Sequence, residues 1–321
     1  MHRATPLPLS LAVFSAAFFA EALPAQEAQT PPSAAAEGSV MKPRFLPGKI
    51  YTFAAETGVA LAGPGEDVSA AARRFVMNHE SRFLTANRDG GEPGVRVTAS
   101  TEKLVLEINA GAKQVRYDSS DPATKDSALA MHFEGATRRS VVMDLDPDGK
   151  VVGSTEVGGG GPATPLPGLP QFGPDQLKQL VVSVLQGFPK DRVAPGQEWT
   201  QKGKRSLGEL GEIDFEINYR YVRDEAHENA DCALIEYTGG IKGDVAVTGV
   251  QPGAGQGKMG FEGRQMTGRF YFDKALGIPR FSEQTLNVNA SVPNPDRLQS
   301  GTIQVPMRQR IVIKLLSLRD A

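Results

Sequence analysis

The chain has 321 residues, of which 40% are apolar and 22% charged, and its net charge at pH 7 is −2. These values are typical of a globular protein with a sizeable core, and they exclude a basic surface that would bind nucleic acid. The 35 glycines and 23 prolines favour many turns. Cys232 is the single cysteine, so an intramolecular disulfide is excluded, and we expect this thiol to act as a small buried apolar residue.

Residues 1–25 have the order of a secretory signal peptide. His2 and Arg3 give a positive start, residues 7–20 form an uncharged apolar run, and small residues up to Ala25 offer a cleavage site. The run is too short for a transmembrane helix, and no nearby cysteine could carry a lipid anchor, so no membrane span is expected after cleavage. We expect export to the periplasm, with the extracellular medium as the alternative compartment and a buried N-terminal helix as the alternative structure. Residues 26–43 are rich in alanine, proline, glutamine and glutamate, which predicts a disordered spacer.

Residues 44–157 are expected to form a first β unit. Leu104–Ile108 alternates apolar and polar side chains with the period of two that is typical of a strand covering a core on one face. Residues 68–77 fit a short helix, although the segment from Arg73 can equally open a strand.

The segment 144–149 has aspartates at its first, third and fifth positions and a glycine at its sixth, which is the opening pattern of a calcium loop. Thr155 stands where such a loop needs a bidentate glutamate, and two valines after Gly149 indicate a returning strand. We therefore interpret the segment as a hairpin turn, with calcium binding as the alternative.

Residues 158–190 combine a connector with one helix. The glycines and prolines of 158–170 suit neither helix nor strand. Pro174 fits the first position of a helix, and apolar residues then recur with a period of 3.6 until Gly187 and Pro189 end it. This apolar face either completes the core or closes a cavity as a lid. We predict a ligand-binding role for its five members, Leu177, Leu180, Val181, Val184 and Leu185.

Residues 191–321 are expected to form a second β unit. In 213–221 every odd-numbered residue is apolar and every even-numbered one is polar. Similar alternation occurs in 303–315, where Gln309 interrupts the apolar face and Pro306 suggests a bulge or a sheet edge. Long half-exposed strands predict an α+β fold that is mostly β, with one or more large curved antiparallel sheets and one central amphipathic helix.

The two β units show a weak internal similarity. Phe45–Thr52 and Val193–Thr200 share the order apolar residue, any residue, Pro-Gly, two residues, aromatic residue, threonine. The segments 141–149 and 270–277 share an apolar strand followed by aspartate and glycine. We interpret this as two similar units on either side of the connector, the alternative being chance likeness between common Pro-Gly turns.

No segment carries a recognisable catalytic motif. Gly253–Lys258 lacks the first glycine and the hydroxyl residue of a phosphate-binding loop, and the histidines lack metal-ligand spacing. The polar segment 117–122 is interpreted as a turn at a strand end. We therefore expect a protein that is not an enzyme, with no catalytic residue, no metal and no cofactor. A hydrolase whose site is assembled from distant residues is the alternative.

The signal peptide, the spacer, the Tyr117-Asp118-Ser119 run, the Asp-turn-Gly strand pair and the Pro195–Trp199 segment together resemble uncharacterised exported bacterial proteins. More loosely, the arrangement resembles lipoprotein carriers of the LolA/LolB and LppX kind, in which a curved antiparallel sheet wraps an apolar cavity and helices close its mouth. The chain is longer than a typical carrier and lacks the acylated cysteine of many members.

The resemblance implies an exported carrier or sensor whose partner is an apolar small molecule or a lipid. The alternative is a non-catalytic structural or interaction module that binds another protein of the cell envelope.

Overall fold

The computed structural model describes residues 38, 40–63, 65–68, 71, 73–158, 172–189, 191–206, 211–247, 257–293 and 302–321. The predicted signal peptide, most of the predicted spacer and connector, and the Gly253–Gly255 turn lie outside these residues.

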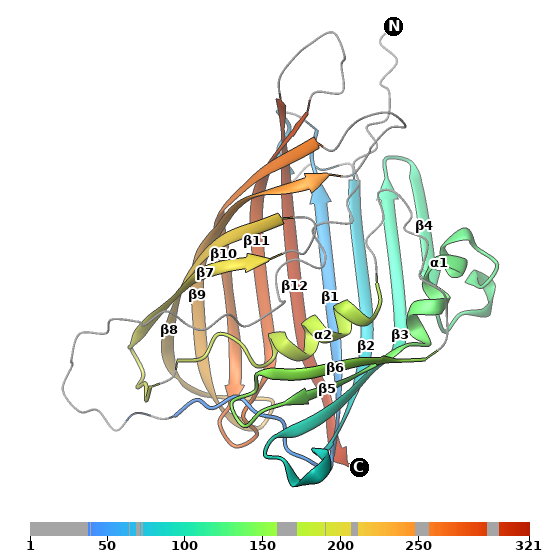
Figure 1. The fold of residues 1–321 in the computed structure, drawn as a ribbon. Coiled ribbons are helices and arrows are strands. Elements are labelled where there is room, and N and C mark those ends of the chain that lie inside the picture. The colour runs from blue at the N-terminus through green and yellow to red at the C-terminus, as the bar shows by residue number, and fades with distance from the viewer. Residues whose placement is uncertain are drawn as a thin grey trace, which may run out of the picture.

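All strands of the described residues belong to one 12-stranded antiparallel sheet (Figure 1). Its order is β6-β5-β3-β2-β1-β12-β11-β10-β9-β8-β7, and β4 pairs with β3 outside this path. The strands are β1 Lys49–Leu61, β2 Arg73–Asn87, β3 Val95–Ala110, β4 Lys113–Asp118, β5 Ser140–Leu145, β6 Val151–Val157, β7 Glu198–Ser206, β8 Gly211–His227, β9 Ala230–Val247, β10 Gly257–Asp273, β11 Ile278–Pro293 and β12 Thr302–Asp320. The α-helices are α1, Ala128–Thr137, and α2, Pro174–Ser183, and two 3-10 turns are η3, Asp89–Gly91, and η4, Pro122–Thr124. The predicted fold class, mostly β with a large antiparallel sheet and a central amphipathic helix, is confirmed.

The predicted β units occupy the two halves of this sheet and meet where β1 pairs with β12. The Pro-Gly turns that suggested their similarity are built alike. Gly48 and Gly196 both have a left-handed φ, 72° and 90°. The N–H of Gly48 donates to the carbonyl of Thr85 in β2 (2.9 Å), and that of Gly196 donates to the carbonyl of Tyr221 in β8 (2.6 Å). The division into two units stays a prediction.

The sheet is strongly curved, so that its edge strands β6 and β7 bend towards the same side, and α2 lies on this concave side (Figure 1). Register shifts between Tyr221 and Arg223 in β8, and between Gly263 and Met266 in β10, mark β-bulges, which bend a strand and increase its twist. Gly268 of β10 lies opposite Tyr237 of β9, and a Cβ atom at this glycine would overlap the tyrosine ring. The missing side chain therefore lets an aromatic ring lie against the backbone of the bent strand.

Apolar side chains line the concave face, as the period of two predicts. Ile213, Tyr219 and Tyr221 of β8 are buried, and so are Leu104 and Leu106 of β3. The convex face is charged and carries cross-strand ion pairs, such as Arg310 with Glu56 (2.8 Å) and Arg269 with Glu283 (2.7 Å). One apolar and one solvated face is the usual pattern of antiparallel sheets.

Two expectations about helices need correction. The helix proposed for residues 68–77 is wrong, because the strand alternative holds from Arg73 onward in β2. The helix α1 was not predicted. The Ser127 hydroxyl begins it by accepting the N–H of Ala130 (3.1 Å), and Phe133 stacks on Tyr117 at 5.9 Å between ring centroids.

Pro306 produces neither a bulge nor an outer edge of the sheet. It lies inside β12 and pairs with Asn289 of β11 without a register shift. Its carbonyl accepts the N–H of Ala62 (3.0 Å), the first residue after β1. The proline is tolerated in a central strand because it lies where the pairing with β1 ends.

We expect Gly268→Ala to destabilise the protein by about 1–3 kcal/mol, because the new methyl group would overlap the Tyr237 ring and the backbone carbonyl of Glu283. The matched control is Gly58→Ala in β1, where a Cβ atom would have its nearest neighbour 4.0 Å away. Since alanine is less flexible than glycine when unfolded, the control should be neutral or stabilising. Urea unfolding of both variants measures the difference, and equal effects would contradict the proposed crowding.

Candidate functional site

Two clusters of buried apolar side chains occupy the concave side, and α2 belongs to only one of them. The α2 cluster consists of Phe45, Tyr51, Phe53, Ala55, Phe83, Val97, Ala99, Val141, Met143, Leu145, Leu177, Leu180, Val181, Val184, Leu185, Ile278, Ile311, Ile313 and Leu315. The large cluster consists of Met41, Val59, Leu61, Phe75, Met77, Leu104, Leu106, Tyr117, Leu129, Ala130, Phe133, Phe172, Val193, Trp199, Ile213, Tyr219, Tyr221, Ala233, Ile235, Tyr237, Ile241, Met266, Phe270, Phe272, Leu286, Val288, Ala290, Val305 and Met307.

The five residues predicted to bind a ligand all lie on the buried face of α2 or in the turn that follows it. Their exposed fractions are 0% for Leu177, 5% for Leu180, 0% for Val181, 2% for Val184 and 9% for Leu185. The structure brings them together in the α2 cluster, where α2 lies against β3 and β5. Their burial agrees with a core-completing helix and with a closed lid, so their role in binding stays a prediction.

A pocket touches this helix region. It has a volume of about 210 Å³ and lies beside Phe45, Val95, Leu145 and Leu185. Pockets for drug-sized ligands begin at about 300 Å³, so this one is too small for a lipid.

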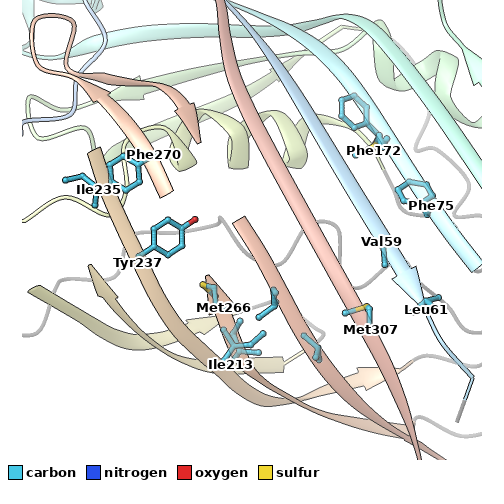
Figure 2. Packing of buried hydrophobic residues seen from close by; sticks show 14 of the residues in the cluster. Val59, Leu61, Phe75, Phe172, Ile213, Ile235, Tyr237, Met266, Phe270 and Met307 are labelled. Atoms are coloured by element: carbon cyan, nitrogen blue, oxygen red, sulfur yellow. The ribbon is translucent and has the colours of Figure 1, made fainter. Parts of the chain in front are cut away.

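The curved sheet has two facing parts, which we call its limbs, and the large cluster lines both of them (Figure 2). Phe75 and Val59 lie on the limb of β1 to β3, and Ile235, Tyr237 and Phe270 lie on the limb of β8 to β10. The concave face is therefore apolar on both limbs. We call the concave side between the two limbs the trough.

An aromatic row crosses the second limb at one level. Trp199 stacks on Tyr219 with 5.4 Å between ring centroids, and Tyr219 contacts Tyr237 at the same distance. The strand register places these rings in one line across β7, β8 and β9. The Trp199 indole N–H donates to the carbonyl of Gly187 (3.3 Å), which ties this row to the segment after α2.

Between the two clusters, each of five successive strands places a polar side chain on the concave face. These residues, which we call the polar belt, are Thr101 of β3, His79 and Ser81 of β2, Thr57 of β1, Gln309 of β12 and Gln284 of β11. All are buried. In β2, for example, Phe75 and Met77 belong to the large cluster, His79 and Ser81 to the belt, and Phe83 to the α2 cluster.

Each belt side chain has a distinct environment. The Nδ1 atom of His79 lies 3.0 Å from the Ser81 hydroxyl, and its ring contacts Phe172 at 4.9 Å between centroids. Burial lowers the pKa of His79 to about 4, because the charged imidazolium loses its hydration. The imidazole is therefore neutral at pH 7.

The remaining belt contacts lie on either side of His79. Thr101 pairs in register with Ser81, but its buried hydroxyl has no hydrogen-bond partner in the part of the chain that the structure describes. On the other limb, the Tyr237 hydroxyl donates to Gln284 Oε1 (3.2 Å), and burial raises the pKa of this tyrosine. The belt is thus a line of neutral hydrogen-bonding groups inside an apolar trough.

The other sequence motifs have structural roles. The segment 144–149 is the β5–β6 hairpin, in which Asp144 pairs with Arg96 (2.8 Å) and Asp146 accepts the N–H of Lys150 (2.9 Å), so the predicted hairpin turn is confirmed. In 117–122, Asp118 accepts the N–H of Ser120 (3.0 Å), which confirms the predicted turn.

Cys232 is fully buried, as expected, and burial raises the pKa of its thiol to about 11.

Nowhere in the described ranges do three or more histidine, cysteine or acidic residues form a group that could hold a metal ion. None of the described helices is long and apolar enough to cross a membrane.

The alternation in the sequence predicted the buried faces of the strands but not the polar belt. One sign of the belt was present, because Gln309 interrupts the apolar face of 303–315. The other members are isolated in the sequence, and only the strand register aligns them.

No known protein family matches the chain, and no curated protein matches it either. A structure of lipovitellin that concerns lipid–protein interactions has a TM-score of 0.44 at 11% identity, covering 87% of this chain and 26% of its own. A Bacteroides fragilis protein described as exported and YmcC-like has a TM-score of 0.26 at 11% identity, covering 88% and 100%. DynF from the dynemicin pathway of Micromonospora chersina has a TM-score of 0.21 at 8% identity, covering 90% and 92%.

The chain thus spans about a quarter of the lipovitellin chain. At these identities and scores, the similarities assign neither a family nor an activity.

We expect Leu180→Ala to lower the free energy of unfolding by about 2–5 kcal/mol if the α2 cluster is close-packed, because a cavity replaces the buried side chain. The control Gln179→Ala, on the same helix but only half-buried, should change stability by less than about 0.5 kcal/mol. Urea unfolding tests both variants. A loss below about 1 kcal/mol for Leu180→Ala would instead indicate a loosely packed lid.

We also expect the stability of the protein to depend on His79 below pH 6.5. The unfolded chain takes up a proton on this residue near pH 6.5, whereas the folded chain does so only near pH 4, so its contribution to stability is complete above pH 6.5 and is lost as the pH falls to 4. Wild type should therefore lose about 3 kcal/mol more than His79→Gln between pH 7 and pH 4. Parallel pH profiles of urea unfolding for the two proteins would contradict this.

Proposed function

We propose that the chain is an exported, non-catalytic carrier or sensor of an apolar or lipid-like ligand, and that this ligand binds in the trough of the curved sheet. The signal-peptide pattern of residues 1–25 supports export, with the periplasm as the expected compartment. The observation that supports ligand binding best is the composition of the large cluster, which is built mainly from strands of the sheet itself.

A sheet with one apolar face must cover that face with another layer of structure. Here α2 covers the end of the trough that carries the α2 cluster, which we call its foot. Across the large cluster, the described residues outside the strands that cover it are few: Met41, Leu129, Ala130, Phe133, Phe172, Phe188 and Val193. The limbs of the sheet instead face each other across the trough.

An apolar trough whose walls face each other is suited to enclose an apolar molecule, since ligand sites are concave and mostly apolar. Binding would remove apolar surface of ligand and protein from water, which contributes about 25 cal/mol for each Å². In this proposal α2 closes the foot of the trough as a lid, and its five apolar residues contact the lower end of the ligand.

One observation favours the alternative of an envelope interaction module. The edge strand β6 exposes Val152 and Val157, whose exposed fractions are 51% and 48%. An exposed strand edge with apolar side chains can pair with a strand of another protein.

A small-to-large substitution in the trough separates these functions. Ala290 of β11 is buried in the large cluster. In a ligand-binding trough, Ala290→Phe should fill space that the ligand uses, so binding of the apolar dye 1-N-phenylnaphthylamine should fall while stability changes by less than about 1 kcal/mol. The control Ala86→Phe adds the same ring at an exposed position of β2 and should affect neither quantity.

If the large cluster is instead a close-packed core, Ala290→Phe should lower the free energy of unfolding by about 1–3 kcal/mol. That loss, together with no dye uptake by the wild-type protein, would refute the carrier and leave the interaction module.

A further inference from the structure

The polar belt is a regular feature of the concave face and is not a set of scattered exceptions. In β3, β2, β1, β12 and β11, the apolar pattern changes to polar side chains at the border between the two clusters. Thr57, Ile311 and Gln284 are in register across three of these strands, and Ser81 faces Thr101 across two others. Gln309 lies one step further along the same face.

Burying polar groups without partners costs free energy, so a buried line of them calls for a compensating interaction. The hydroxyl of Thr101 is the clearest case, because the residue is only 7% exposed and this oxygen has no hydrogen-bond partner among the described residues. Its neighbour across the strands is Ser81, whose hydroxyl lies 3.0 Å from His79. Together they offer an unused hydrogen-bonding position beside two polar groups.

The belt residues also restrict the charge that a bound ligand group can carry. Its members are threonine, serine, glutamine and histidine, and the histidine is neutral at pH 7. A full charge placed here would lose its hydration without gaining an opposite charge among the belt residues. An uncharged hydrogen-bonding group fits this environment.

We propose that the belt, at Thr101, Ser81 and His79, binds the uncharged polar end group of an aliphatic ligand, such as the hydroxyl of a long-chain alcohol. This inference rests on the proposed function, and it adds the class and orientation of the ligand. The side chains of α2 occupy the side of the belt that carries the α2 cluster. The aliphatic chain therefore lies on the other side of the belt, along the large cluster, and its polar end points towards α2.

Competition against 1-N-phenylnaphthylamine, with 1-tetradecanol, tetradecane and tetradecanoate as probes, tests this assignment in the full-length mature protein. Thr101→Val removes the unpartnered hydroxyl while keeping the shape of the side chain. It should weaken tetradecanol binding about five- to tenfold, the effect of one hydrogen bond, and leave tetradecane binding unchanged. The control Thr98→Val lies on the opposite face of β3, where it is half-buried, and should leave both affinities unchanged.

The outcomes distinguish the inference from the function on which it rests. If the wild-type protein binds neither the dye nor any probe, the proposed function fails. If it binds them, but Thr101→Val leaves tetradecanol binding unchanged or weakens both probes equally, the belt assignment is overturned. Tighter binding of tetradecanoate than of tetradecanol at pH 7 would overturn the uncharged class. Should Thr101→Val fail to fold, Ser81→Ala tests the same site from β2 with the same expected selectivity.

Discussion

The whole structure depends on how one very wide sheet keeps its apolar face away from water. The described residues contain no second sheet to pack against it, and its two α-helices are short. The sheet therefore bends until its own limbs face each other, and α2 covers the foot. The bulges of β8 and β10 and the glycine opposite Tyr237 are the local means of this bending.

The same constraint explains why the concave side has two clusters of different kinds. The α2 cluster has a helix to fill it, so it resembles the core of an α+β protein. Among the described residues, the large cluster is built mostly from strands. Polar side chains lie at the border in five strands, where they separate the α2 cluster from the large cluster.

Much of this architecture follows from the sequence. Alternation in 213–221 and 303–315 predicted which side chains are buried, and the period of 3.6 predicted α2 from Pro174 onward. The segment 144–149 was correctly interpreted as a turn because glycine and aspartate act locally. Features of this kind depend on neighbours in the sequence, so they can be predicted from it.

The features that sequence reasoning missed depend on partners far away in the chain. The pairing of β1 with β12 joins residues between 246 and 271 positions apart, and no local pattern encodes it. His79 and Thr101 became members of one belt only through the register of β2 with β3. The helix α1 lacks a strong apolar period, and its start depends on the Ser127 cap.

The pairing of β1 with β12 also bears on how the molecule acquires its shape. The centre of the sheet consists of the strands that come earliest and latest in the described sequence. A chain emerging from its N-terminus must therefore hold β1 with one unpaired edge until β12 has emerged. Contacts of such long sequence separation slow folding, and an open apolar strand edge invites association in the meantime. A chain of this topology is therefore most exposed to association before its C-terminal strand closes the sheet.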